Sequence, residues 1–275
     1  MIRSPRGQPL ALPGNPPMPS PEPSLQPLAA CLGSALVISK AGPHPRKQRI
    51  VADLHAAGLP FTFLDATMGA DLGPEELAAC YDEQAALHHR TGSRRLHASM
   101  IGCFLSHRRA WQEVRRGQHP SAIILEDDAM PVPGFHPATA VLAVQELPAD
   151  WDLLYLGVRG QRLPPIGHGL KRCLFLPLAR LLFPGKYRFS LAEYGRLYQR
   201  PFSAHLHRAG YHQGTHAYAV SRRGAEKLLG FPGRISAPPD AFLGDQIMAG
   251  KLNAFALREE LFTTTGAGSQ IVSSL

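Results

Sequence analysis

The chain lacks the apolar stretch that a membrane-spanning helix requires, because its 275 residues contain no run of about 18 apolar residues. It also lacks the basic, apolar and small-residue succession of a signal peptide, so we expect neither membrane spanning nor Sec export. Cysteine is scarce: Cys31, Cys80, Cys103 and Cys173 form no CxxC pair and have no histidine at zinc-finger spacing. We expect reduced thiols in a cytoplasmic protein.

Acidic residues are fewer than basic ones, 21 against 29, which gives a net charge of +8. The excess is local. Between Arg159 and Tyr211, ten basic residues accompany a single acidic one, Glu193, so this segment carries +9 and the rest of the chain is close to neutral. Because the sequence has no RNP, zinc-finger or P-loop pattern, we expect no nucleic-acid partner.

Proline divides the chain into two parts. Residues 1–32 hold nine of the 26 prolines and almost no aromatic or β-branched residues, so we expect a disordered leader followed by one domain over 33–275. Within that domain, short apolar runs alternate with amphipathic stretches, which predicts an α/β fold. The expected strands span 35–39, 61–64, 122–125, 151–156 and 216–220, and the expected helices span 46–57, 74–88, about 99–116 and 221–229.

Three acidic residues, Glu126, Asp127 and Asp128, directly follow the apolar run 122–125. Ligands of open α/β sheets bind beyond the carboxyl ends of the strands, and adjacent carboxylates repel one another unless a cation binds them. A divalent ion that bridges them to a diphosphate is one interpretation, and a solvated acidic turn is the other. Asp65 ends the second expected strand in the same way, although an isolated Asp there is more commonly a turn or cap residue.

Other candidates have equally plain structural alternatives. Asp240 and Asp245 lie five residues apart and either carboxylate can serve as a general base, but Asp240 after two prolines is also typical of a helix cap. Ser106 and His107 lie on or beside the apolar stripe of the helix at 99–116, where a hydrogen-bonded core histidine is the commoner case. Gly102 on the same helix indicates close helix packing.

Several motifs resemble, in order and spacing, those of the glycosyltransferase family 25 enzymes, which include lipopolysaccharide β-galactosyltransferases and collagen galactosyltransferases. The motifs are VISK, FLDATMG, IGCFLSHRRAW, AIILEDDAM, WDLLYLG, GTHAYAVSRRGAEKLL and PPDAFL, and they extend from about residue 34 to the C-terminal part. The resemblance implies a GT-A fold with a Rossmann-like nucleotide half. It also implies metal-assisted, inverting transfer of galactose from a UDP-sugar to a lipopolysaccharide-type or lipooligosaccharide-type saccharide, with Mn²⁺ or Mg²⁺.

The resemblance assigns roles to individual residues. Donor binding falls on Ser39, Arg46, Asp65, Ser106, His107, Glu126, Asp127, Thr215 and His216. The metal falls on Asp127 and Asp128, and the family's PxD block falls on Pro238 and Asp240, whereas Asp245 is a candidate base only by its place five residues further on. Gly102, Cys103, Gly214, Tyr218 and Pro238 complete the matching motifs. Lys40 and Met68 depart from the family pattern beside the expected uridine pocket.

The basic segment 159–211 is expected to be an insert that faces the acceptor or a membrane. Its apolar run 174–183 is flanked by Lys171, Arg172, Lys186 and Arg188, a composition typical of an interfacial segment on anionic lipid. A lipid-linked acceptor on the inner face of a bacterial inner membrane fits this interpretation, and a buried helix pair is the alternative. Two other function classes stay open, a divalent-metal phosphodiesterase or nuclease and a non-catalytic basic peripheral membrane protein.

Overall fold

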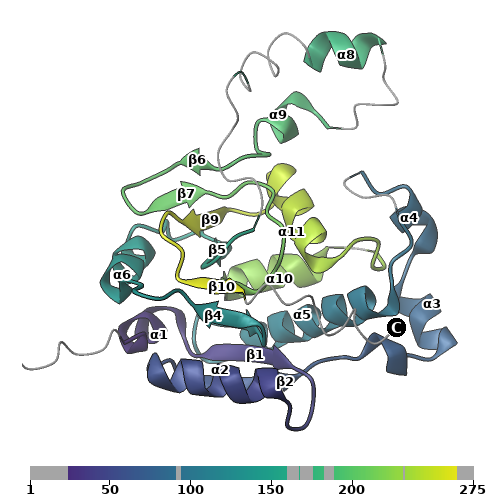
Figure 1. Ribbon diagram of the computed structural model, residues 1–275. Helices are drawn as coiled ribbons and strands as arrows, with labels where there is room; N and C mark the ends of the chain where they lie inside the picture. The colour runs from purple at the N-terminus through teal and green to yellow at the C-terminus, as the bar shows by residue number, and fades with distance from the viewer. Residues whose placement is uncertain are drawn as a thin grey trace, which may run out of the picture.

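The computed structural model describes residues 24–90, 94–159, 167, 176–182, 189–231 and 233–264. Its centre is an eight-stranded sheet in the order β2-β1-β3-β8-β5-β9-β7-β6, and β4 pairs with β10 in a separate small sheet (Figure 1). The strands are β1 (Ala35–Ser39), β2 (Phe61–Asp65), β3 (Ser121–Glu126), β4 (Ala129–Pro131), β5 (Leu153–Tyr155), β6 (Arg200–Pro201), β7 (Leu206–Arg208), β8 (Ala217–Ser221), β9 (Ala254–Leu257) and β10 (Phe262–Thr264).

The direction of the strands brings several chain ends to one edge of the sheet. β1 is parallel to β2 and β3, and β5 is parallel to β9, whereas β8 runs antiparallel between β3 and β5. The carboxyl ends of β1, β2, β3 and β5 therefore lie at the edge where β8 begins. This mixed α/β arrangement confirms the expected Rossmann-like fold class.

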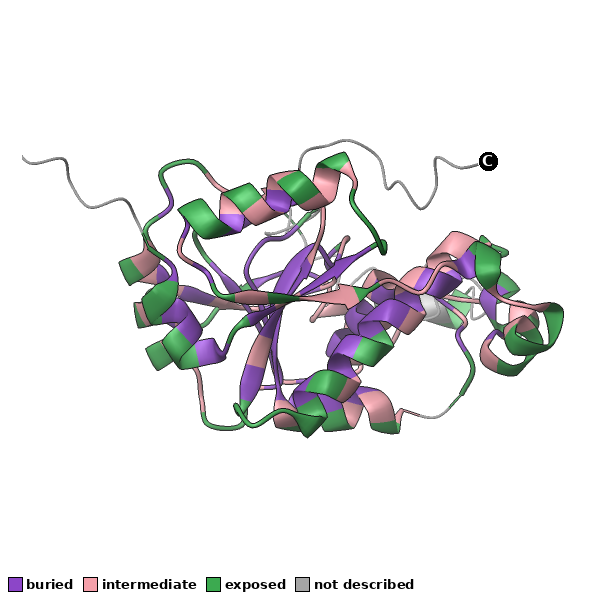
Figure 2. Cartoon of the chain, turned by 90° about the horizontal axis from the view of Figure 1, so that it is seen from below, coloured by how far each residue is buried: buried purple, intermediate pink, exposed green. Residues whose placement is uncertain are grey.

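Helices cover both faces of the sheet. They are α1 (Gln26–Leu32), α2 (Pro45–Ala56), α3 (Pro74–Cys80), α4 (Glu83–Leu87), α5 (Ala98–Arg116), α6 (Pro137–Gln145), α8 (Leu176–Leu182), α9 (Leu191–Tyr194), α10 (Arg222–Gly230) and α11 (Pro239–Met248), with the 3-10 helix η1 (Gly69–Asp71). One apolar core joins α1, α2 and α6 to one sheet face, and a second joins α5, α10 and α11 to the other. Figure 2 shows buried residues along the strands and on the inner faces of the helices.

The structure corrects the expected boundary of the leader. Residues 26–32 form α1, and Leu25, Leu28 and Leu32 are at most 1% exposed within the first core. Leucines spaced three and four residues apart give a short helix one apolar face. The many prolines around these leucines made the segment look like disordered chain in the sequence. The domain therefore begins before residue 33, and residues 1–23 lie outside the described part of the chain.

Two further expectations need adjustment. The expected helix 74–88 is two helices, because α3 ends at Cys80, Tyr81 bridges to Ile235 and Asp82 caps α4 through the Ala85 N–H. The basic insert is not wholly an appendage, because its later part supplies β6 and β7 to the central sheet. Lys171, Arg172, Lys186 and Arg188 lie outside the described residues. No helix within the described ranges has the length and apolar character needed to cross a bilayer.

Candidate active site

The acidic turn lies between β3 and β4, beside the end of β1. Asp127 accepts a hydrogen bond from the Ser39 hydroxyl at 2.9 Å, and its carboxylate lies 3.7 Å from both His44 Nε2 and Arg46 Nη1. His44 also caps α2, because its Nδ1 accepts from the Lys47 N–H. Nδ1 is thus an acceptor, so Nε2 carries the proton that it donates to Ser39 Oγ at 2.9 Å. His44 was not among the residues expected at the site, although its place between two prolines just after a strand was a usable signal.

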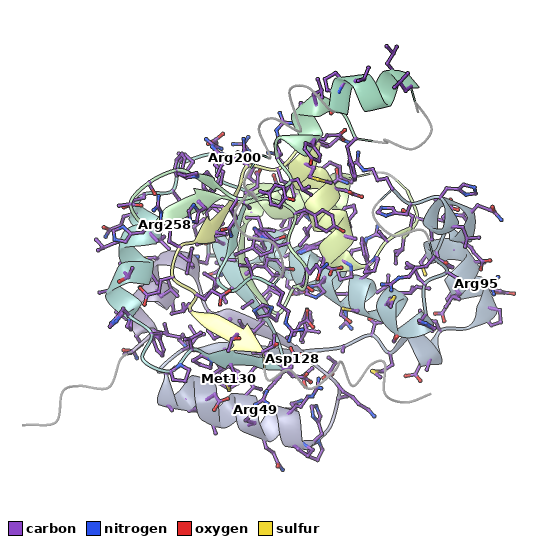
Figure 3. The ribbon with its side chains drawn as sticks, turned by 45° about the horizontal axis from the view of Figure 1, so that its top comes forward. Arg49, Arg95, Asp128, Met130, Arg200 and Arg258 are labelled. Atoms are coloured by element: carbon purple, nitrogen blue, oxygen red, sulfur yellow. The ribbon has the colours of Figure 1, made fainter. Side chains whose placement is uncertain are left out.

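Within the acidic turn at 126–128, Asp128 has unused hydrogen-bonding capacity. Its Oδ1 is buried and has no hydrogen-bond partner within the described residues. Burial, together with repulsion from Glu126 and Asp127, raises the pKa of Asp128 to about 6, although Arg46 and Arg159 oppose this shift. Figure 3 shows Asp128 at the small sheet that contains Met130. A buried, unsatisfied carboxylate oxygen in a cluster of like charges is the arrangement that a bound cation stabilises.

Glu126 ends a chain of hydrogen bonds that starts in the core. Trp111 Nε1 donates to Tyr218 OH at 2.9 Å, so the Tyr218 proton is available to His107 Nδ1, also at 2.9 Å. His107 Nε2 then donates to Thr215 Oγ1 at 3.1 Å, and the Thr215 hydroxyl donates to Glu126 at 2.6 Å. Burial opposes ionisation of Glu126, but its interactions with His107 and Thr215 outweigh burial and lower its pKa. His107 and Thr215 therefore hold an ionised carboxylate at the end of β3.

Ser106 and Gly102 attach the loop after β2 to α5. Ser106 Oγ accepts from the Thr67 N–H and donates to the Gly102 carbonyl, both at 2.8 Å. A Cβ atom at Gly102 would lie 2.4 Å from the Thr67 carbonyl oxygen, so this contact requires glycine. The close packing expected at Gly102 is confirmed, and Ser106 acts here as an anchor of the loop.

The segment before β8 brings Asp240 to the same region. Asp240, in the first turn of α11, accepts from the Gly214 N–H at 3.0 Å. His216 follows two residues later, with a buried Nδ1 that has no hydrogen-bond partner within the described residues. Burial lowers the pKa of His216 despite the nearby charge of Glu126, so its imidazole is neutral at pH 7. Asp240 thus lies against the segment that carries Thr215 and His216.

Asp245 and Asp65 have different surroundings. Asp245 pairs with His89 at 2.8 Å and with Arg90 at 3.3 Å, and Arg90 also contacts Glu193 at 2.5 Å. No contact within the described ranges joins Asp245 to the acidic turn. Of the two candidate bases, Asp240 is therefore the one that lies near the acidic turn, through its contact with the segment before β8. Asp65 is exposed and lies opposite Ser39 in the β1–β2 register, at the same edge of the sheet.

A second set of metal-ligating groups does not fit an oxygen-preferring ion. Cys103, His107 and Glu126 each offer one ligand atom, and these three atoms lie within 4.8 Å of one another. His107 and Glu126 are already joined through Thr215, and burial raises the pKa of the Cys103 thiol well above its ordinary value. Mn²⁺ and Mg²⁺ prefer carboxylate oxygens. Asp127 and Asp128 fit such an ion better, because Asp128 Oδ1 has no hydrogen-bond partner within the described residues and can act as a ligand.

Comparisons with known proteins identify the family to which this site belongs. Residues 34–243 match the model of "Glycosyltransferase family 25 (LPS biosynthesis protein)". The chain is 26% identical over 202 residues to human "Procollagen galactosyltransferase 2", covering 72% of this chain and 28% of that protein. It is 28% identical over 215 residues to the bovine "Probable inactive glycosyltransferase 25 family member 3", covering 75% of this chain and 30% of that protein. The chain therefore spans only about three-tenths of these relatives.

Proposed function

The chain belongs to glycosyltransferase family 25, and from this premise we propose that it is an active transferase that moves galactose from a UDP-sugar to a saccharide acceptor. The observation that carries the proposal is the buried, unsatisfied Asp128 oxygen in the acidic turn, with Arg46 and Arg159 close enough to affect its pKa. Galactose as the sugar is supported by the name of the human relative, a procollagen galactosyltransferase.

The residues divide the work of the transfer. Asp127 and Asp128 would hold Mn²⁺ or Mg²⁺, which supplies neutralising charge to the diphosphate leaving group when bound. Arg46 adds a fixed positive charge at the same edge of the sheet. Asp240 accepts the proton of the attacking acceptor hydroxyl, and attack from the side opposite the diphosphate inverts the anomeric carbon.

The acceptor and the location are further parts of the proposal. We infer a lipid-linked saccharide of the lipopolysaccharide type, supported by the description of the family. The enzyme then works at the cytoplasmic face of an anionic membrane. Support comes from α8, which exposes Leu178, Leu181 and Leu182 at 56%, 78% and 59%.

The test is release of UDP from a panel of UDP-sugars, with and without Mn²⁺, using truncated lipooligosaccharide and a collagen peptide as acceptors. We expect UDP to be released from UDP-galactose only when both metal and lipooligosaccharide are present. Asp128→Asn should abolish this release and leave the melting temperature unchanged. Glu113→Gln, which changes an exposed carboxylate on α5, is the matched control and should be fully active. Normal turnover by Asp128→Asn would refute the metal role, and no turnover by the parent with any donor would refute the activity.

A further inference from the structure

A second charged region lies in a cleft of about 570 Å³ between β7, the start of β9, α10 and the end of α11. Six of its fifteen lining residues are cationic and one is acidic, so we call it the basic cleft. The cationic residues are Arg196, Arg200, Arg208, Arg223, Lys227 and Lys251. Asp150 lines it as well.

The basic cleft lies at the edge of the sheet opposite the acidic turn. β8 leaves the candidate active site after His216 and ends at Ser221, whose N–H donates to the Asp152 carbonyl. Five strand residues at ~3.3 Å each separate the two edges by roughly 17 Å. A ligand in the basic cleft therefore occupies a site distinct from the donor site.

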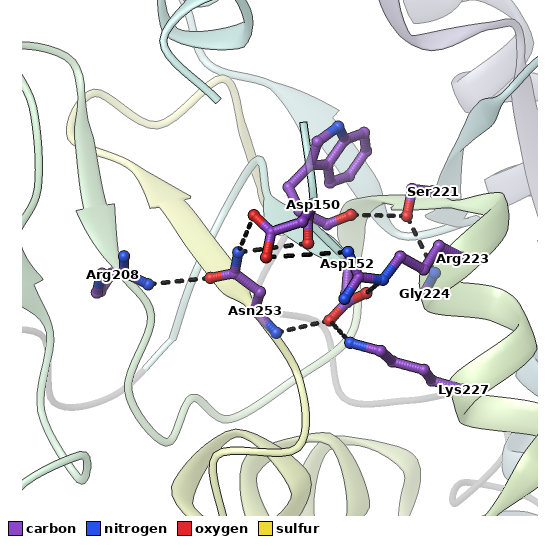
Figure 4. Close-up of polar contacts among 9 residues, drawn as sticks. Asp150, Asp152, Arg208, Ser221, Arg223, Gly224, Lys227 and Asn253 are labelled. Atoms are coloured by element: carbon purple, nitrogen blue, oxygen red, sulfur yellow. Dashed lines mark hydrogen bonds and ion pairs between the residues drawn. The ribbon is translucent and has the colours of Figure 1, made fainter. Parts of the chain in front are cut away.

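A fixed network forms the floor of the cleft (Figure 4). Asp152 is fully buried and accepts from Lys227 Nζ at 2.5 Å and from the Asn253 N–H at 2.7 Å. The Asn253 side chain donates to Asp150 at 2.9 Å and accepts from Arg208 at 2.9 Å. This network fixes the positions of Lys227 and Arg208 before any ligand binds, and Asp152 balances the charge of Lys227.

The remaining cations outnumber the carboxylates near them. Arg196 donates to the neutral Met248 carbonyl, and Arg208 lies 4.9 Å above the Phe202 ring. Lys251 lies 5.4 Å above the Phe231 ring. These partners are neutral, whereas Arg223 lies 3.8 Å from the Asp150 carboxylate and 3.7 Å from the Asp152 carboxylate. The six cations of the cleft therefore face two carboxylates, and the positive charge is in excess. Several positive charges in one concave site repel one another, and a bound anion relieves that repulsion.

The residue types indicate which anion fits. Planar guanidinium groups form paired hydrogen bonds with the oxygens of a phosphate or a carboxylate. The cleft holds more guanidinium groups than one carboxylate ligand could bind, so its charge and hydrogen-bond donors fit a phosphate better. Phe202, 37% exposed, adds an apolar surface at the same site. We propose that the basic cleft binds a phosphate-bearing ligand, either a phosphorylated saccharide or a phosphate head group of a lipid. The proposal does not depend on the transferase activity.

The test compares phosphate binding by the parent and by the double variant Arg200→Gln/Lys251→Gln. Both residues are exposed, so we expect the fold to be kept, which a melting curve verifies. The probes are inorganic pyrophosphate, glucose 6-phosphate and glucose, titrated by calorimetry. Arg95→Gln/Arg116→Gln removes the same charge from two exposed arginines elsewhere and is the matched control. Arg46→Gln identifies any pyrophosphate that binds at the donor site instead.

We expect the double variant to bind pyrophosphate and glucose 6-phosphate about tenfold or more weakly, while the control pair binds like the parent and glucose does not bind. A second arm measures sedimentation with phosphatidylglycerol and phosphatidylcholine vesicles. Binding of the soluble phosphates assigns the cleft to a saccharide phosphate, and binding only to phosphatidylglycerol, lost in the double variant, assigns it to a lipid head group. Equal binding of every phosphate probe by parent and double variant, or no binding by the parent, overturns the proposal.

Discussion

At the scale of single residues, the two aspartates of α11 differ by their partners rather than by their sequence context. Asp240 touches the backbone at Gly214, next to Thr215, whereas Asp245 pairs with His89 and Arg90. We expect Asp240→Asn to lower kcat about 10²- to 10⁴-fold with UDP binding kept, because it removes a proton acceptor. Asp245→Asn should keep kcat and lower stability by about 2 kcal/mol, because it leaves Arg90 with a weaker partner. Kinetics and urea unfolding of both variants measure the difference, and a reversed pattern would move the base to Asp245.

The hydroxyl of Thr215 is the second feature that acts at this scale. It connects His107 to Glu126, and the direct distance between those two side chains is 3.4 Å. Thr215→Val has the same shape but lacks the hydroxyl, so we expect about 1–3 kcal/mol lower stability and weaker donor binding. Thr215→Ser restores the hydroxyl and should recover donor binding, measured as KM for the UDP-sugar. If Val and Ser behave alike, the methyl group rather than the hydrogen bond is what matters.

At the scale of elements, α1 contributes to the first core although the sequence around it is rich in proline. Leu28 is fully buried and α1 packs against α6. Leu28→Ala should therefore lower the free energy of unfolding by about 2–5 kcal/mol, the cost of a cavity in a well-packed core. Leu142→Ala on α6, where the leucine is 47% exposed, is the matched control and should change stability little. Equal effects of the two variants would show that α1 does not stabilise the core.

The helix α8 is the opposite case, because its Leu178, Leu181 and Leu182 are exposed. We expect Leu178→Ser/Leu181→Ser to weaken sedimentation with phosphatidylglycerol vesicles at least several-fold, because the transfer of two apolar side chains to lipid is lost. The melting temperature should stay unchanged, since exposed positions cost within about 0.5 kcal/mol. Leu142→Ser removes an exposed leucine elsewhere and should bind vesicles like the parent. Undiminished vesicle binding by the α8 variant would exclude this helix from the membrane contact.

At the scale of the whole molecule, the strands, helices and turns that could be predicted from the sequence are those that depend on the pattern of neighbouring residues. The strands β1, β3 and β8 and the long helix α5 follow from apolar runs and periodicity, and the acidic turn follows from its place after β3. The partners of these residues do not follow in the same way. His44 reaches Asp127, and Asp152 pairs with Lys227, only because distant segments converge. Short strands such as β6, β7 and β10 carry too few residues for a pattern to be visible.

The cluster of Arg90, Glu193 and Asp245 joins α9 and α11 to the chain after α4, and it makes the stability of the whole molecule depend on pH. Burial raises the pKa of Glu193, but hydrogen bonds from Ser190 and Arg90 outweigh burial and lower it to about 2 from an ordinary 4.5. A carboxyl group whose pKa is lower in the folded state stabilises the fold above its unfolded pKa, and this contribution is lost as the pH falls from about 4.5 towards 2.

Glu193→Gln should therefore lower the free energy of unfolding by roughly 2 kcal/mol at pH 7, and the difference from the parent should disappear near pH 2. Urea unfolding of both chains between pH 2 and pH 7 measures it. Glu113→Gln, at a site that is 49% exposed with Arg116 at 3.7 Å, should change stability by less than about 0.5 kcal/mol across the same range. A deficit of Glu193→Gln that stays constant down to pH 2 would mean that the glutamate stabilises the fold through packing and not through its charge.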